Sequence, residues 1–222
     1  MRKTLFIFIL LTIVILSAPR AGAQNPELFI TWRAENYTPP GYSGRVLPSV
    51  GTPMEASFEL VDGGKIIDVS KYEIRWLFGD RFYKTATGLK TLSYAPSLTS
   101  ESVPLKITVV GYNGGDMEKE ITIPIARPEI VIAAPYPNRE IGPGKNIFRA
   151  LPYFFNIQSP SELSFEWLVN KEKAVSGGEN PDSLELDTPE EARGLQIALS
   201  VFAQGLKNPL EFASSFMSFF VR

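Results

Sequence analysis

The chain offers few of the side chains that usually carry out catalysis. It contains no histidine and no cysteine among its 222 residues. This composition excludes a Ser-His-Asp triad, a thiol nucleophile and zinc sites built from cysteine and histidine. Paired carboxylates or a Ser-Lys pair remain compatible with the composition, but no spacing argues for them. Gly142-Pro143-Gly144-Lys145 lacks the phosphate-loop pattern, so no nucleotide cofactor is expected.

The acidic residues are the remaining candidates for chemistry. Calcium takes six or more oxygens in proteins, commonly from an Asp-x-Asp-x-Asp run, and the sequence has no such run. Phe78-Gly79-Asp80 could present a carboxylate to a ligand, but Gly-Asp more often closes a turn in which the aspartate binds backbone amides. We therefore predict no catalytic residue, no metal and no cofactor. The acidic residues that could contribute oxygens to such a site are Asp62, Asp68, Asp80, Asp116, Glu118 and Glu129.

Alternating apolar and polar residues predict an all-β chain. In the segment 72–80, Ile74, Trp76 and Phe78 point to one side, and Gly79-Asp80 ends the strand. Further strands are expected at 28–37, 52–61, 66–69, 91–94, 103–112 and 118–125. In the strand at 103–112 we expect four residues on the inner face, namely Leu105, Ile107, Val109 and Gly111. Asn113-Gly114 is a hairpin signal.

The second half of the chain repeats this pattern. Phe165-Glu166-Trp167 matches Ile74-Arg75-Trp76, and strands are expected at 129–134, 147–157, 163–169, 184–186, 196–203 and 212–221. The repeat predicts two tandem immunoglobulin-like β-sandwiches at 24–126 and 127–222. Ala126-Arg127-Pro128 is a very short linker, so the pair should behave as a semi-rigid rod.

The first 23 residues have the pattern of a secretory signal peptide. A basic start at Arg2-Lys3 precedes an apolar run, and Ala21-Gly22-Ala23 is a small-x-small cleavage site. The apolar run, 5–16, is about 12 residues and a membrane span needs about 20, so we expect cleavage after Ala23. The alternative is an uncleaved N-terminal anchor, which would be the only contact with a membrane. The mature protein is expected to be extracellular, periplasmic or on the cell surface.

The charge balance argues against nucleic acid as a partner. The formal net charge is −2; without Arg2, Lys3 and Arg20 the chain after residue 23 has 19 basic and 24 acidic residues, a net of −5. No basic face is evident. An exported chain without cysteine is common in bacteria, whereas a eukaryotic secreted domain usually carries disulfides.

The first repeat resembles a known family of extracellular domains. Trp76-Leu77-Phe78-Gly79-Asp80, followed by Leu105-Lys106-Ile107-Thr108-Val109-Val110 and a Gly-rich hairpin, is similar to the PKD (polycystic kidney disease-type) branch of the immunoglobulin-like fold. The chain departs from that pattern at Arg81, where the family has glycine, and of the family's His-x-Tyr motif only Tyr94 could remain. The resemblance implies adhesion, spacing, or contact with proteins or glycans, and no catalytic residues.

Strand parity points to one surface for binding. In the second half, Leu168, Phe202, Phe216 and Phe220 alternate with the inward residues, so they should form an exposed apolar patch of the kind that marks interfaces. Two alternatives are that domain 1 packs on this patch, or that the parity is shifted by one residue. Tyr37 and Tyr42, with Trp32, could form a sugar platform beside the Pro39-Pro40 loop, or could be core and rim aromatics.

These observations predict a non-enzymatic protein of the cell envelope that binds a protein or glycan through its β-sandwich surfaces. The alternative is an accessory or chaperone subunit of a surface assembly such as a pilus. An envelope hydrolase is the third hypothesis.

Overall fold

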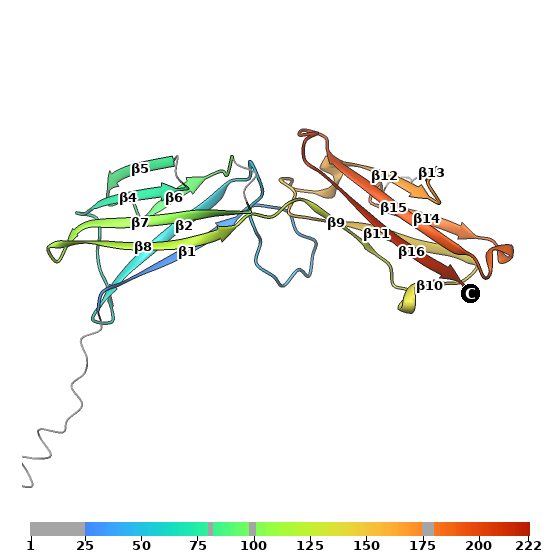
Figure 1. Cartoon of the computed structure of the whole chain (residues 1–222), viewed down its shortest axis with the longest axis horizontal. Coiled ribbons are helices and arrows are strands. Elements are labelled where there is room, and N and C mark those ends of the chain that lie inside the picture. Colours follow the sequence, from blue (N-terminus) through green and yellow to red (C-terminus); the bar gives the residue numbers. More distant parts are fainter. Residues whose placement is uncertain (1–24, 80–81, 98–100, 175–179) are drawn as a thin grey trace, which may run out of the picture.

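The structure, a computed structural model, describes residues 25–79, 82–97, 101–174 and 180–222. The predicted signal peptide and Asp80 lie outside the described residues. The strands form two β-sandwiches in tandem, arranged end to end along the long axis of the molecule (Figure 1).

The first sandwich packs two antiparallel sheets against each other. In one sheet, β2 pairs with β1, β3 and β6; in the other, the order is β5-β4-β7-β8. The bounds are β1 Glu27–Ala34, β2 Met54–Asp62, β3 Lys65–Ile66, β4 Glu73–Phe78, β5 Phe82–Thr87, β6 Thr91–Tyr94, β7 Ser102–Tyr112 and β8 Gly115–Pro124. Because the chain changes sheets between β2 and β4 and again around β6, the connections are those of an immunoglobulin-like Greek key.

The second sandwich repeats this topology. One sheet has the order β14-β11-β9, and the other has the order β13-β12-β15-β16 with β10 added in parallel to the end of β16. The bounds are β9 Glu129–Ala133, β10 Glu140–Ile141, β11 Gly144–Tyr153, β12 Leu163–Val169, β13 Glu172–Ala174, β14 Ser183–Thr188, β15 Gln196–Gly205 and β16 Phe212–Val221. Three short 3-10 helices lie in its turns, at Pro137–Arg139, Pro160–Glu162 and Glu190–Ala192. The predicted pair of tandem immunoglobulin-like sandwiches is therefore confirmed.

Each sandwich has its own core around one tryptophan. Trp76 on β4 and Trp167 on β12 are both buried. The Nε1 group of Trp76 donates to the carbonyl oxygen of Leu89 at 2.8 Å, and that of Trp167 donates to the carbonyl oxygen of Pro181 at 3.3 Å. Both acceptors lie just before the next strand of the opposite sheet. The two domains therefore share not only the sequence repeat but also the same hydrogen bond from the core tryptophan.

Several strand predictions require correction. The expected inner face of β7 ends at Val109, because a bulge between Val109 and Tyr112 shifts the register. Gly111 is exposed with φ +73°, and Tyr112 is buried in its place. The prediction for Gly111 was wrong because a bulge adds a residue that alternation does not count. The sequence pattern did not predict β5, β10 or β13. Three expected strands also end at least three residues earlier in the structure: β1 at Ala34, β3 at Ile66 and β11 at Tyr153.

Candidate functional site

The outer side of β16 carries a row of exposed phenylalanines. Phe212, Phe216 and Phe220 are 55%, 66% and 47% exposed, whereas the alternating residues Phe219 and Val221 are buried. The pleat of a strand places every second side chain on the same side, so the three rings lie along one face. The alternation in the sequence places Phe216 and Phe220 on the outer side of this strand, and both are exposed in the structure.

The register of the sheet extends this row across its neighbours. Leu168 on β12, Ser200 on β15 and Phe216 on β16 lie in one cross-strand line. Phe202 is 37% exposed, and its ring centroid lies 5.8 Å from that of Phe212. We call the outward large apolar residues of these strands the aromatic face. It comprises the half-buried Leu168 and the exposed Phe202, Phe212, Phe216 and Phe220. It contains the four residues singled out in the sequence and adds Phe212, which the same alternation could have identified.

Domain 1 does not cover the aromatic face, since these phenylalanines are exposed with both domains present. The residues between the rings are small or uncharged, among them Ser200, Ser214, Ser218, Gln196 and Gln204. The outward Glu166 of β12 is held by Lys173 of β13 at 2.8 Å. The face therefore combines apolar rings with uncharged polar side chains and is close to neutral.

The matching face of domain 1 is different in kind. On β7 and β8 the outward positions carry charged and hydroxyl side chains, with Lys106 bound to Glu118 at 2.7 Å and Thr108 donating to the same carboxylate at 3.1 Å. These two hydrogen bonds lower the pKa of Glu118. A face of this kind stays hydrated, so domain 1 has no matching row of aromatic side chains on the described part of β7 and β8.

The two loop tyrosines lie at the junction between the domains. Tyr37 forms an antiparallel bridge with Phe155, in which the Tyr37 N–H donates to the Phe155 carbonyl and the Phe154 N–H donates to the Tyr37 carbonyl, both at 2.8 Å. The ring of Tyr42 packs edge-on against Tyr153 and Phe154, with centroids 5.7 and 5.9 Å apart. Burial, and then the charge of Asp182, raise the pKa of Tyr37.

These contacts make the loop between β1 and β2 a second connection between the domains, beside the linker. The Asn36 side chain donates to the Phe154 carbonyl at 2.7 Å, which adds to the bridge. The third aromatic candidate, Trp32 on β1, is stacked under Arg45 of the loop, whose guanidinium carbon lies 3.8 Å from the ring centroid. The rings that could have formed a sugar platform thus contact the protein's own residues.

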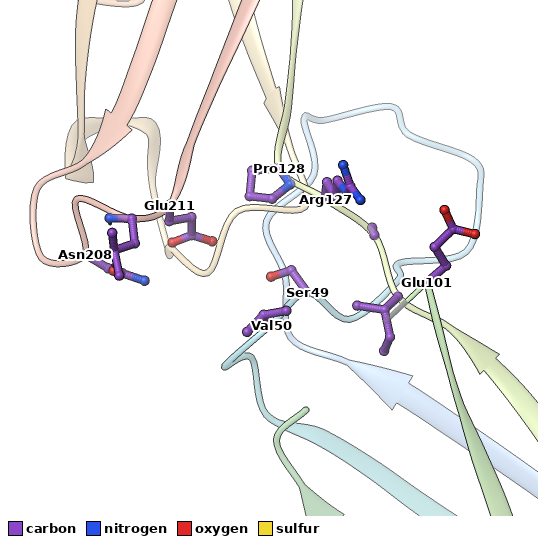
Figure 2. A pocket seen from close by; sticks show the side chains of 10 residues that line it. Ser49, Val50, Glu101, Arg127, Pro128, Asn208 and Glu211 are labelled. Carbon is purple, nitrogen blue, oxygen red and sulfur yellow. Dashed lines mark hydrogen bonds between the residues drawn. The ribbon is translucent and has the colours of Figure 1, made fainter. Parts of the chain in front are cut away.

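A cleft of about 470 Å³ lies at the same junction (Figure 2). Its walls come from the loop before β2, the linker and the β15–β16 hairpin loop. Figure 2 shows Ser49 and Val50 across from Glu211, with Arg127 and Glu101 farther along. The lining residues are Ser49, Val50, Glu101, Ile125, Ala126, Arg127, Pro128, Asn208, Leu210 and Glu211.

Glu211 is the unusual residue of this cleft. It is only 9% exposed, and its Oε1 accepts from the Asn156 N–H at 2.5 Å. Burial raises the pKa of its carboxyl group, although the hydrogen bond from Asn156 acts in the opposite direction. Nothing in the sequence marks this residue, because its burial depends on a loop 55 residues earlier in the chain.

The described residues contain no cluster of three or more histidine, cysteine, aspartate or glutamate side chains that could hold a metal. Two of the acidic candidates bind groups of domain 1: Asp62 accepts from the hydroxyl of Tyr112 at 2.7 Å, and Asp116 accepts from the N–H of Gly111 at 3.0 Å. In the described part of the chain, no helix has the length and hydropathy needed to cross a membrane.

Comparisons with known proteins give low similarities. Neither a protein-family model nor a curated protein matches the chain. Among solved structures, the fibronectin(III)-like modules of CbhA from Clostridium thermocellum are 14% identical at a TM-score of 0.32, with 87% of this chain and 94% of that chain covered. Three N-terminal domains of the Hoc capsid protein of bacteriophage RB49 are 12% identical at a TM-score of 0.42, covering 87% and 59%. Immunoglobulin domains 1–4 of Sidekick-1 are 14% identical at a TM-score of 0.31, covering 90% and 70%.

Proposed function

We propose that this chain is a non-enzymatic, exported protein of the bacterial cell envelope that binds a protein partner through the aromatic face of domain 2. The observation that carries the proposal is the row of exposed phenylalanines on β16, which domain 1 leaves open. The strand end at Trp76–Asp80, similar to PKD domains, and the absence of cysteine support an extracellular, bacterial setting.

The composition of the face favours a protein over a glycan. Aromatic residues are enriched and charged residues are depleted in the buried centres of protein interfaces, which is the composition found here. Phenylalanine has no polar group with which to bind a sugar hydroxyl. The serines between the rings have short side chains, and only two glutamines, Gln196 and Gln204, lie on the described strands of this face. Removing several phenylalanine rings from water is by contrast a strong, non-directional driving force for association.

Capture of the partner from intact cells tests this function. Crosslinking followed by pull-down of the wild type should recover a surface protein, and the double variant Phe216→Ser with Phe220→Ser should recover at least about tenfold less, because truncation of central aromatic residues costs about 2 kcal/mol or more. The folded state of the variant is checked by circular dichroism.

Two controls separate binding from folding. Phe219→Ser replaces the inward neighbour, which is 1% exposed, and should destabilise the domain strongly. Ile66→Ser removes a side chain that is 68% exposed on domain 1 and should leave capture unchanged. Unfolding of the Phe216/Phe220 variant, or full capture by a folded one, would contradict the proposal.

Export is tested on the mature protein. N-terminal sequencing of the chain recovered from the envelope or medium should begin at Gln24, as expected for cleavage after Ala23. Recovery of an intact Met1 in a membrane fraction would instead indicate an uncleaved anchor.

A further inference from the structure

The interdomain cleft contains a buried carboxylate without an oppositely charged partner. Among the described residues, no lysine or arginine nitrogen lies within ion-pair distance of Glu211. Within the described residues, the carboxylate accepts a hydrogen bond at Oε1 from the Asn156 N–H, and no described group donates to Oε2. A mostly buried carboxylate is costly unless it is paired, so this position favours a cation.

The remainder of the cleft is mostly apolar. Val50 on the domain 1 wall and Leu210 on the domain 2 wall are 43% and 87% exposed, and Ile125, Ala126 and Pro128 complete the lining between them. A volume of about 470 Å³ lies within the range of small-ligand sites, which combine apolar walls with a few polar groups.

We infer that this cleft binds an organic cation, a primary ammonium group on an apolar stem, with Glu211 as the carboxylate that receives the ammonium and Val50 and Leu210 in contact with the stem. The site is separate from the aromatic face and does not depend on the function proposed for it.

The arrangement fits an ammonium group better than a metal ion. Calcium requires six or more oxygens, whereas the charged side chains of the cleft are Glu211, Glu101 and Arg127. An ammonium group has three donors and needs one charged acceptor, and a methylene stem gains free energy from apolar walls. Arg127 lies on the linker and forms no ion pair with the described carboxylates, so it leaves Glu211 available.

The test is a titration of the ¹⁵N-labelled protein with n-hexylamine, followed by NMR at the Asn156 amide that donates to Glu211. Saturable shifts of this amide are expected with hexylamine and not with n-hexanol, which has the same stem without the charge. Nα-acetyl-lysine methylamide distinguishes the source: tighter binding than hexylamine assigns the site to a lysine side chain of a polypeptide, and weaker binding assigns it to a free amine. Both results support the proposal.

The variants make the test specific. Glu211→Gln keeps an oxygen that can accept from Asn156 and should weaken hexylamine binding at least about tenfold, as expected for loss of a charge-assisted hydrogen bond. Glu101→Gln, a matched change in the same cleft, should alter it less than about threefold. Equal binding of hexanol, equal binding by Glu211→Gln, or saturation of the same amide by calcium would overturn the assignment.

A measurement on the wild type makes the result independent of the folding of any variant. Hexylamine affinity should fall as the pH is lowered through the raised pKa of Glu211, because the protonated carboxyl group no longer attracts an ammonium ion. Glu101→Gln, which removes the other carboxyl group of the cleft, should show the same profile as the wild type. An affinity independent of pH would overturn the proposal.

Discussion

At the scale of single residues, the two tryptophans have equivalent roles in their domains. Each ring is buried in one core, and each Nε1 donates to a backbone carbonyl in the connection that leads to the opposite sheet. This hydrogen bond satisfies the indole and also attaches the connection to the core. An interior aromatic residue without a donor group could fill the space but not bind the carbonyl.

Replacing Trp76 or Trp167 by phenylalanine should therefore destabilise the affected domain. We expect a loss of about 1–3 kcal/mol in the free energy of unfolding for each, from an unsatisfied carbonyl and reduced packing. Urea denaturation monitored by far-UV circular dichroism measures the change. Trp32→Phe, at a half-buried tryptophan packed against the edge of the domain 1 core, is the matched control and should cost less. Equal losses at all three positions would contradict the assignment.

Glu211 makes a second prediction at this scale. Burial raises its pKa, so the folded state binds its proton more tightly than the unfolded state does. The free energy of unfolding should therefore decrease as the pH rises from the ordinary glutamate range through the raised pKa, the opposite of the usual behaviour of paired carboxylates. Other groups, such as Glu118 with its lowered pKa, contribute the opposite sign.

The difference between Glu211→Gln and wild type isolates this contribution. The variant should gain stability relative to wild type as the pH rises through that window, and the difference should be constant above it. Chemical denaturation at several pH values measures it. A difference that does not change with pH would show that the carboxyl group titrates alike in the folded and unfolded states.

At the scale of elements, the β7–β8 hairpin shows how backbone geometry modifies a regular pattern. Asn113 and Gly114 both have positive φ, as the hairpin signal in the sequence predicts. Two residues earlier, Gly111 also has positive φ and is part of the bulge that turns Tyr112 inward. The buried Tyr112 then donates its hydroxyl to Asp62, which raises the pKa of the tyrosine.

Gly111→Ala should destabilise domain 1 by about 1–2 kcal/mol, because an L-residue at this φ is strained. No atom lies near a Cβ at this position, so the cost is one of backbone conformation alone. Gly115→Ala is the control in the same hairpin: its φ is not positive, its Cβ would also be free, and it should be close to neutral. Thermal denaturation distinguishes them, and equal effects would contradict this account.

At the scale of the whole molecule, the two sandwiches are joined at two places. The linker is one, and the loop between β1 and β2 is the other (Figure 1). This loop contributes the bridge from Tyr37 to Phe155 and the contacts of the Tyr42 ring with Tyr153 and Phe154. Phe154 has a φ of +59°, a conformation rarely adopted by bulky residues, and its N–H and carbonyl groups are both bound to the loop. Two connections restrict bending more than one short linker does.

The double variant Asn36→Ala with Tyr42→Ala should therefore leave both domains folded and widen the range of their relative orientations. Residual dipolar couplings should report a separate alignment for each domain, and small-angle scattering a broader distribution of interatomic distances. Arg45→Ala, in the same loop but stacked on Trp32 of domain 1, should leave both measurements unchanged. An unchanged orientation in the double variant would show that the linker alone sets it.

The sequence by itself determined the fold class, the internal repeat and the outward positions of the aromatic face. These depend on alternation along single strands, which a period of two residues makes visible without knowledge of the partner strands. The bounds of several strands and the bulge at Gly111 could not be predicted from the alternation, because they depend on pairing between strands. Only the tertiary structure showed that Tyr37 and Tyr42 join the domains and that Glu211 is buried in a cleft. Burial and contact between distant loops are set by how the two domains pack, and no local pattern in either loop encodes that packing.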